Sequence, residues 1–353
     1  MAAACVEAAP AAAGVALHRT TAQPAARKRM RVAMGTTEDY DYEDACRLGE
    51  GAFGAVIRAR HRRTGRAVAM KYLGEDGGGQ AELLRESLLL EAASAGNPFV
   101  VASRGLARDP ATADLCLVMD CGGVTLRDAL RCQPGPLPES TVRAAMWQLL
   151  EGAKRMHAAH IVHRDIKPHN ILLGDDRVLR LCDFGLAVHM SEPPPYGQAG
   201  TLWYMAPEVL LGMPDYDALV DAWSLGCVMA QLLNGEAPFQ GADEDDQLSA
   251  IVGVLGVPDD KGWPWFWSTK FAAEMPEMDK KRCKTSILRC KCPETKLSEE
   301  GFQVLSGLLT CNPDKRLTAA AALKHPWFAK MDEPQLPKKD EVVAPLTKRQ
   351  RLQ

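Results

Sequence analysis

The sequence predicts an α+β fold with two lobes, a small antiparallel sheet in the N-terminal lobe and a mainly helical C-terminal lobe. Three observations predict it. Between residues 42 and 119, short β-branched and apolar runs alternate with turn residues, and one helical pattern lies among them. From residue 123 to about 328, helical periodicity predominates. The chain has 353 residues, 46% of them hydrophobic and 25% charged, so it can bury the core of one large domain.

Both ends of the chain are expected to lie outside this domain. Residues 1–41 are predicted to be a disordered N-terminal extension, because they are low in complexity and poor in aromatic residues. Their basic cluster at residues 27–31 fits a nuclear address or a solvated tail, and an organelle transit peptide is a third interpretation. Residues 329–353 are assigned to a C-terminal tail.

The first predicted hairpin turns at a glycine-rich segment with the spacing G-x-G-x-x-G-x-V. Without side chains there, backbone N–H groups can approach phosphate oxygens. A dinucleotide-binding unit would need a helix directly after the third glycine. Residues 55–59 instead alternate like a strand, which favours a nucleotide site on a hairpin. The predicted contacts are Leu48, Gly49, Glu50, Gly51, Ala52, Phe53, Gly54, Ala55 and Val56.

The next predicted strand ends at Lys71, whose amine can reach the α- and β-phosphates of a nucleotide. A lysine in a strand is more often an exposed surface charge, but the glycine turn upstream favours the phosphate role. Residues 80–94 follow a helical pattern. Glu86 on this helix is the predicted ion-pair partner of Lys71, and Glu82, one turn earlier, is the alternative.

Two more strands are expected at residues 99–106 and 114–119, closing the small sheet. The strand pattern breaks at Asp120, Cys121 and Gly122, where we expect a hinge between the lobes whose backbone groups bind adenine. A long amphipathic helix is predicted over residues 139–160. Its expected buried face is Val142, Met146, Leu149, Leu150 and Met156.

The segment from His163 to Asn170 has the spacing H-R-D-x-x-x-x-N, typical of a phosphoryl-transfer loop. By itself it could be a charged surface turn. However, Asp183-Phe184-Gly185 and then Ala206-Pro207-Glu208 follow in the order that phosphoryl transfer requires. Asp165 is therefore the predicted acceptor of the proton from the attacking hydroxyl, and Asn170 and Asp183 are predicted to ligate two Mg²⁺ ions.

With these motifs in order, residues from about 42 to 328 resemble a eukaryotic protein kinase domain of the cyclin-dependent kinase branch, and most of all the plant group F kinases. The resemblance implies the two-lobed protein kinase fold and a serine/threonine protein kinase that uses ATP and Mg²⁺. It implies that Lys167 reaches the γ-phosphate and that Thr201 bonds to Asp165. The stretches that carry it in the C-terminal lobe are residues 201–204, 206–212, 220–227 and 312–316.

The resemblance also implies two structural contacts and shows several departures. Asp221 is expected to brace the catalytic loop, and Arg316 to pair with Glu208. The helix that meets the cyclin in this branch has the pattern P-S-T-A-I-R-E, of which residues 80–86 share only the last two, so a cyclin partner is not favoured. Ala52 and Phe53 replace the phosphorylated Thr-Tyr pair of the glycine-rich loop.

The segment between Asp183 and Glu208 departs from the branch as well. Tyr196 stands where the branch has its activating threonine. Arg164, which would normally meet a phosphate, is expected to pair instead with Glu192 or with a phosphorylated Ser191 or Tyr196. Met205 replaces the arginine that the branch uses in a proline-selective pocket, so a strict demand for proline after the phosphoacceptor is not expected.

Composition limits the partners and the location. The formal charge of −3 offers no bulk attraction to nucleic acid or anionic membranes, and no apolar run is long enough for a membrane span. The 11 cysteines suit a reduced intracellular protein, in the nucleus or the cytoplasm. We expect a monomeric kinase domain with protein substrates. A pseudokinase used as a scaffold and a small-molecule or lipid kinase are the alternatives from other classes.

Overall fold

The computed structural model describes residues 32–51, 54–74, 79–259, 261–276 and 286–330. Ala52 and Phe53, at the tip of the glycine-rich turn, lie outside the described residues. Among the helices in these ranges, none is both long and apolar enough to cross a membrane.

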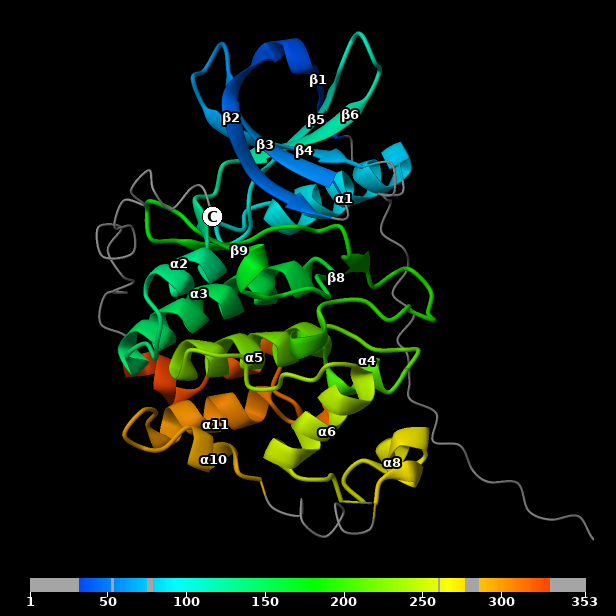
Figure 1. The fold of residues 1–353 in the computed structure, drawn as a ribbon, viewed down its shortest axis with the longest axis vertical. Helices are drawn as coiled ribbons and strands as arrows, with labels where there is room; N and C mark the ends of the chain where they lie inside the picture. The colour runs from blue at the N-terminus through cyan, green and yellow to red at the C-terminus, as the bar shows by residue number, and fades with distance from the viewer. Residues whose placement is uncertain (1–31, 52–53, 75–78, 260, 277–285, 331–353) are drawn as a thin grey trace, which may run out of the picture. The chain divides into compact units, whose positions relative to one another are not determined.

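The N-terminal lobe contains a six-stranded sheet in the order β1-β5-β6-β4-β3-β2, drawn in blue to green-cyan in Figure 1. Neighbouring strands are antiparallel, as expected, except that β1 runs parallel to β5. The predicted glycine-rich hairpin is the β2–β3 pair. The strands are β1 (Met34–Thr36), β2 (Tyr40–Gly51), β3 (Gly54–His61), β4 (Ala67–Leu73), β5 (Ser103–Arg108) and β6 (Leu115–Asp120).

The predicted boundary of the N-terminal extension at residue 41 is wrong, because the segment from Val32 belongs to the sheet. The Leu106 backbone N–H donates to the Ala33 carbonyl at 2.8 Å, and Met34 pairs with Leu106. Thr37, in the short 3-10 helix η1 (Thr37–Asp39), is buried. Such an edge strand is short and lacks apolar alternation, so local pattern does not reveal it.

Helix α1 (Gly79–Ser94) packs on strands β4, β5 and β6 and buries Leu83, Leu89 and Leu90. The opposite side of the sheet has a small core of its own, around Met70 and Val118. The strand expected at residues 99–106 starts later, at Ser103. The residues before it enter the main core, where Val101 donates its backbone N–H to the Leu181 carbonyl at 2.9 Å.

The C-terminal lobe is mainly helical, as predicted (Figure 1). Its α-helices are α2 (Leu126–Cys132), α3 (Glu139–Ala158), α4 (Pro207–Leu210), α5 (Leu219–Asn234), α6 (Glu244–Leu255), α7 (Pro264–Trp267), α8 (Lys270–Glu274), α10 (Leu288–Lys291), α11 (Glu299–Leu308) and α12 (Ala319–Ala322). Its short strands are β7 (Val124–Thr125), β8 (Ile161–Val162), β9 (Ile171–Leu173), β10 (Leu179–Leu181) and β11 (Val188–His189). The 3-10 helices are η2 (Pro168–Asn170), η3 (Leu202–Tyr204), η4 (Pro313–Lys315) and η5 (Pro326–Lys330).

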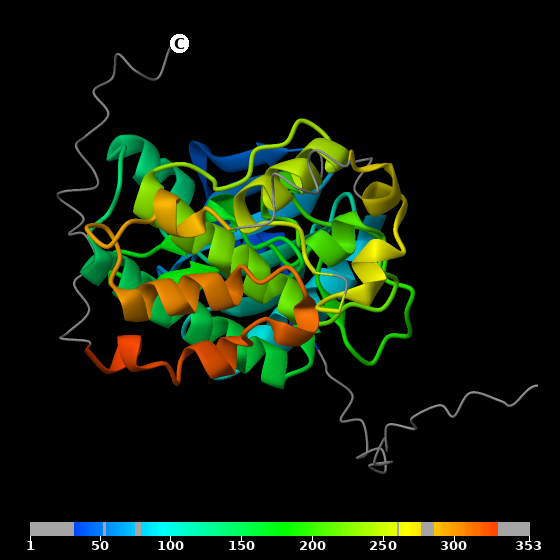
Figure 2. The ribbon, with the colours of Figure 1, turned by 90° about the horizontal axis from the view of Figure 1, so that it is seen from below.

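Helices α3 and α5 form the centre of this lobe. All five residues predicted as the buried face of α3 are buried. Helix α5 is apolar on nearly every side, and α3 and α11 pack against it (Figure 2). The predicted pair of Arg316 and Glu208 is confirmed, because two guanidinium nitrogens lie 2.6 and 2.7 Å from the two carboxylate oxygens. This buried ion pair ties α4 to the chain after η4.

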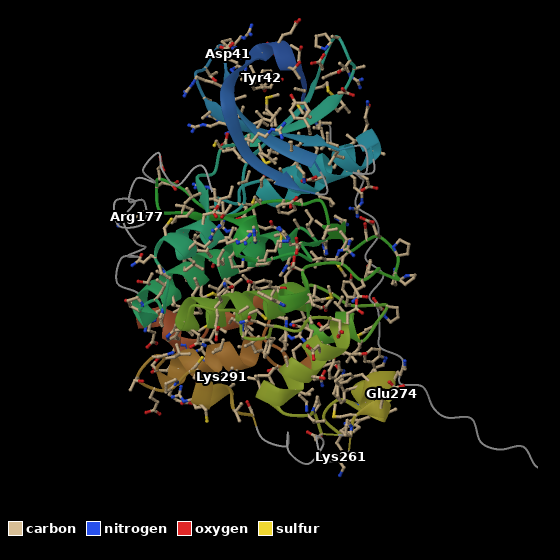
Figure 3. All side chains as sticks on the ribbon, in the orientation of Figure 1. Asp41, Tyr42, Arg177, Lys261, Glu274 and Lys291 are labelled. Carbon is tan, nitrogen blue, oxygen red and sulfur yellow. The ribbon has the colours of Figure 1, made fainter. Side chains whose placement is uncertain are left out.

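A separate aromatic cluster around Trp263 and Phe266 packs against Val252 of α6, and the partly buried Trp265 and Trp267 pack against this cluster. Figure 3 shows this end of the lobe, with Glu274 on α8 and Lys291 on α10, far from Asp41 and Tyr42 on the sheet. The candidate site lies between these ends, where the sheet meets β9 and the loop from His163 to Asn170.

Candidate active site

The loop from His163 to Asn170 joins β8 to β9, and Asp221 of α5 holds its backbone. The two Asp221 carboxylate oxygens accept the backbone N–H groups of His163 and Arg164, each at 2.9 Å. The predicted brace is therefore confirmed. Burial raises the pKa of Asp221, but hydrogen bonds and charge from His157 and His163 outweigh it and hold that pKa below its usual value. The brace also supports the left-handed backbone of Arg164, whose φ is 68°.

The carboxylate of Asp165 is held by three side chains. Thr201 Oγ1 donates to Oδ1 at 2.7 Å, while Lys167 Nζ lies 2.8 Å and Asn170 Nδ2 lies 2.9 Å from Oδ2. Lys167 also donates to Thr201 Oγ1 at 2.6 Å. All three partners donate to the carboxylate, so the arrangement orients it as an acceptor at the mouth of the loop.

Across the cleft, Lys71 of β4 contacts two acids at once. Its Nζ lies 2.8 and 2.9 Å from the Glu86 carboxylate oxygens and 2.7 Å from Asp183 Oδ1. Burial lowers the pKa of Lys71, but Asp183 and Glu86 outweigh it and raise that pKa to about 12. Glu86 is thus the partner that the sequence favoured, and the alternative Glu82 is exposed.

These three groups differ in their access to solvent. The side chain of Glu86 is 4% exposed and that of Lys71 10%, whereas that of Asp183 is 44% exposed. A Cβ at Gly185 would lie 3.5 to 3.6 Å from all three charged groups, so this glycine keeps the space beside them open. Lys71 and Glu86 therefore form a buried pair, and Asp183 presents a carboxylate to the cleft.

The hinge after β6 lies very close to β9 because Gly122 and Gly123 have no side chains. A Cβ at Gly122 would lie 2.5 Å from Leu172 Cδ1, and one at Gly123, where φ is 100°, would lie 2.1 Å from the Leu173 carbonyl oxygen. Among the described residues, no backbone hydrogen bond outside helices and strands uses Cys121 or Gly122. Their N–H and C=O groups are thus available to the edge of a planar ligand.

A cavity of about 940 Å³ opens at this hinge. Leu48, Cys121, Gly122 and Leu173 line it, but Lys71 and Asp183 do not. It continues around the outside of the hinge to the β9–β10 turn, where Figure 3 shows Arg177 at the edge of the molecule. The cavity therefore reaches Leu48 and Leu173 beside the hinge, and Lys71 and Asp183 lie outside it.

Comparison with known proteins identifies the family. The family model described as "Protein kinase domain" matches residues 42–328. The chain is similar to the putative cyclin-dependent kinase F-2 of Oryza sativa subsp. japonica, with 44% identity over 83% of this chain and 91% of that protein. The chain belongs to the protein kinase family. More narrowly, it is a cyclin-dependent-kinase-like serine/threonine kinase of group F.

Other relatives place the kinase in the same branch. Cyclin-dependent kinase B2-1 of Arabidopsis thaliana is 37% identical over 83% of this chain and 95% of its own length. Cyclin-dependent kinase G-2 of Oryza sativa subsp. indica is also 37% identical, but the chain spans only 42% of that protein. The chain thus covers most of some relatives and less than half of others.

The site of this kinase fits a nucleotide with its metal ions. Asp183 presents a carboxylate, and the amide nitrogen of Asn170 is used by Asp165, which leaves the Asn170 amide oxygen for a cation. A Cβ at Gly49 would meet nothing within 4 Å, so the described part of the glycine-rich strand is open there. The described residues contain no group of three or more His, Cys, Asp or Glu that could hold a metal. Mg²⁺ does not need such a group, because one or two protein oxygens suffice when phosphate oxygens and water complete its coordination shell.

The structure brings together most of the predicted site residues but corrects one contact. Arg164 does not pair with Glu192. Its guanidinium donates to the Leu186 carbonyl at 2.6 Å and to the Tyr216 hydroxyl at 2.9 Å. Glu192 pairs instead with Arg85 of α1, at 3.0 Å. The sequence analysis did not predict this pair. It also did not predict that Leu172 lies beneath the hinge, although Leu172 is an apolar residue only two positions after Asn170.

Proposed function

We propose that this kinase transfers the γ-phosphate of ATP to serine or threonine hydroxyls of proteins, with Asp165 as the group that orients the hydroxyl and accepts its proton. The observation that carries the proposal is the assembled set of Lys71, Glu86 and Asp183 across from the Asp165–Lys167–Thr201 cluster. Phosphoryl transfer has a loose transition state, so catalysis consists mainly of positioning and of stabilising charge on oxygens.

Each site residue has a role in this proposal. Lys71, oriented by Glu86, binds the α- and β-phosphates, and the glycine-rich residues 48–56 cover them. Asp183 and Asn170 would hold two Mg²⁺ ions, which supply positive charge to the phosphate oxygens when bound. Lys167 binds the γ-phosphate, and the backbone of Asp120, Cys121 and Gly122 receives adenine. Thr201 keeps the Asp165 carboxylate turned toward the acceptor.

Protein substrates follow from the family, and we propose that cyclin is not required. The relatives are named cyclin-dependent kinases, but residues 80–86 share only Arg85 and Glu86 with the pattern of the helix that meets the cyclin in that branch. We further propose a monomeric intracellular enzyme, in the nucleus or the cytoplasm. The composition supports this location, and the cysteines that the structure describes as free fit a reduced compartment.

A kinase assay on the purified chain tests the function. With ATP, Mg²⁺ and a degenerate peptide library, we expect phosphorylation of serine and threonine without a strict demand for proline at the next position, and loss of activity with EDTA. Asp165→Asn and Asp183→Asn should each lower kcat by about 100-fold or more, because they remove the proton acceptor or a metal ligand rather than core packing.

The matched control is Asp114→Asn, the same chemical change on an exposed turn between β5 and β6, which should leave kcat unchanged. Added cyclins should not raise the rate. Wild-type rates in both active-site variants would refute the assigned roles. Phosphorylation of a sugar or lipid but of no peptide would show a small-molecule kinase, and ATP binding without any transfer would show a pseudokinase.

A further inference from the structure

Helix α1 carries two neighbouring side chains that reach opposite parts of the site. Glu86 is buried and contacts Lys71, whereas Arg85 extends to the segment after Asp183. Arg85 Nη1 donates to the Ala187 carbonyl at 2.7 Å, and Nη2 lies 3.0 and 3.1 Å from the two carboxylate oxygens of Glu192. Arg85 therefore connects α1 to the segment after Asp183, and the next residue, Glu86, contacts Lys71.

The carboxylate of Glu192 is fixed before it meets Arg85. It accepts the backbone N–H of His189 at 3.1 Å, and the Glu192 N–H donates to the His189 carbonyl at 2.8 Å, which closes a tight turn. Burial raises the pKa of Glu192, but the His189 N–H and Arg85 outweigh it and hold that pKa below its usual value. Because the turn orients the carboxylate, less side-chain entropy is lost when the ion pair forms.

Among the described contacts between α1 and this segment, the Arg85–Glu192 pair is the one between opposite charges. Arg164 also contacts the segment, but its acceptors are neutral: the carbonyls of Leu186 and Gly197 and the hydroxyl of Tyr216. Both guanidinium groups are thus engaged by groups of the chain itself. The carboxylate that stands opposite α1 is a permanent part of the chain.

We propose that Glu192 is a positioning residue, a built-in carboxylate whose ion pair with Arg85 keeps α1 where Glu86 meets Lys71, so that the kinase is active without phosphate on residues 183–208. The proposal rests on the proposed kinase function. The pair is partly exposed, with 33% and 45% of the two side chains accessible, so its value lies in coupling two elements more than in global stability.

The test uses the full chain, treated with phosphatase and shown by intact mass to carry no phosphate. The wild type should remain active, and Glu192→Gln should lower kcat on the order of tenfold while the KM for ATP changes less. Arg85→Gln should show a loss at least as large, because it also breaks the bond to the Ala187 carbonyl. The double variant should lose no more than Arg85→Gln alone, because both substitutions break the same ion pair. Backbone hydrogen exchange in residues 79–94 should be faster in Glu192→Gln than in wild type.

The matched control is Glu299→Gln, which breaks an ion pair with Arg289 of similar exposure, 60% and 29%, at a place remote from the site. It should change neither activity nor exchange in α1. Wild-type activity and exchange in Glu192→Gln would overturn the proposal. So would additive losses in the double variant, or a wild type that is active only when phosphorylated. If no form of the wild type phosphorylates any acceptor, the proposed function fails, and exchange in α1 alone decides the role of Glu192.

Discussion

At the scale of single residues, two loops of the site each contain a residue with an unusual backbone conformation. Asp183 and Arg164 have φ values of 66° and 68°, in the left-handed region that residues other than glycine rarely adopt. Asp221 accepts the backbone N–H of Arg164 and so supports that backbone conformation, whereas Lys71 bonds to the side-chain carboxylate of Asp183. Removing Asp221 should therefore affect the backbone of the loop, and removing Lys71 should affect the charges of the site.

Lys71→Met tests how much the buried charges of the site contribute to stability and to activity. The variant leaves Glu86 buried without its cation, so we expect the free energy of unfolding to fall by about 1–3 kcal/mol, together with loss of kinase activity. Adding Glu86→Gln removes the unpaired charge and should recover part of that stability, while activity stays lost. Thermal unfolding of the wild type, the single variant and the double variant measures this. A double variant less stable than Lys71→Met would contradict the account.

Single residues were also what the sequence predicted best. Asp165, Asn170 and Asp183 belong to motifs whose spacing is set by chemistry, and local sequence is enough to recognise them. The Arg85–Glu192 pair joins residues far apart in the chain, both partly exposed, and no periodicity marks such a contact. Arg164 was considered as a partner of Glu192 only because the resemblance to the kinase branch implied a phosphate near Arg164.

At the scale of elements, the stretch from Tyr196 to Met205 positions Thr201 against Asp165. Gly200 has φ of 119°, and a Cβ there would lie 2.5 Å from the Arg164 carbonyl oxygen. Glycine adopts this left-handed backbone at little cost. This close approach brings the stretch onto the catalytic loop.

Gly200→Ala should therefore move Thr201 away from Asp165. We expect kcat/KM to fall by about tenfold or more, since the added methyl group meets both backbone strain and a fixed carbonyl. Gly197→Ala, where a Cβ would meet nothing within 4 Å, is the matched control and should retain activity. Steady-state kinetics with one peptide substrate compares them. Equal activity of the two variants would show that Gly200 is not required.

Element boundaries were predicted less well than element types. Helix α1 was predicted from residue 80 and begins at Gly79, and α3 begins at Glu139 as expected. The β5 strand, in contrast, starts at Ser103 instead of residue 99, because Phe99, Val100 and Val101 are apolar for another reason. Val100 and Val101 pack into the main core, and the Phe99 ring packs against Trp147 of α3. A short apolar run cannot distinguish a strand from such a buried loop.

At the scale of the whole molecule, the lobes are joined by more than the hinge. Val101 and Leu181 exchange a backbone bond, and Leu181 also donates to the Phe99 carbonyl at 2.8 Å. The main core includes Leu83 and Leu90 of α1 together with Met146 and Leu149 of α3. Sequence patterns predicted the two lobes separately, but this continuity depends on tertiary contacts that have no local signature.

The parallel strand β1 has a consequence for handling the protein. The family model begins at residue 42, and a chain cut there would lose β1 and also Tyr40, whose ring lies 5.3 Å from that of His61. The backbone groups of β5 would then form a bare sheet edge, which templates pairing between molecules. We expect such a protein to self-associate as its concentration rises, whereas one that begins at Val32 stays monodisperse. Light scattering over a concentration series compares the two, and equal behaviour would show that β1 does not protect this edge.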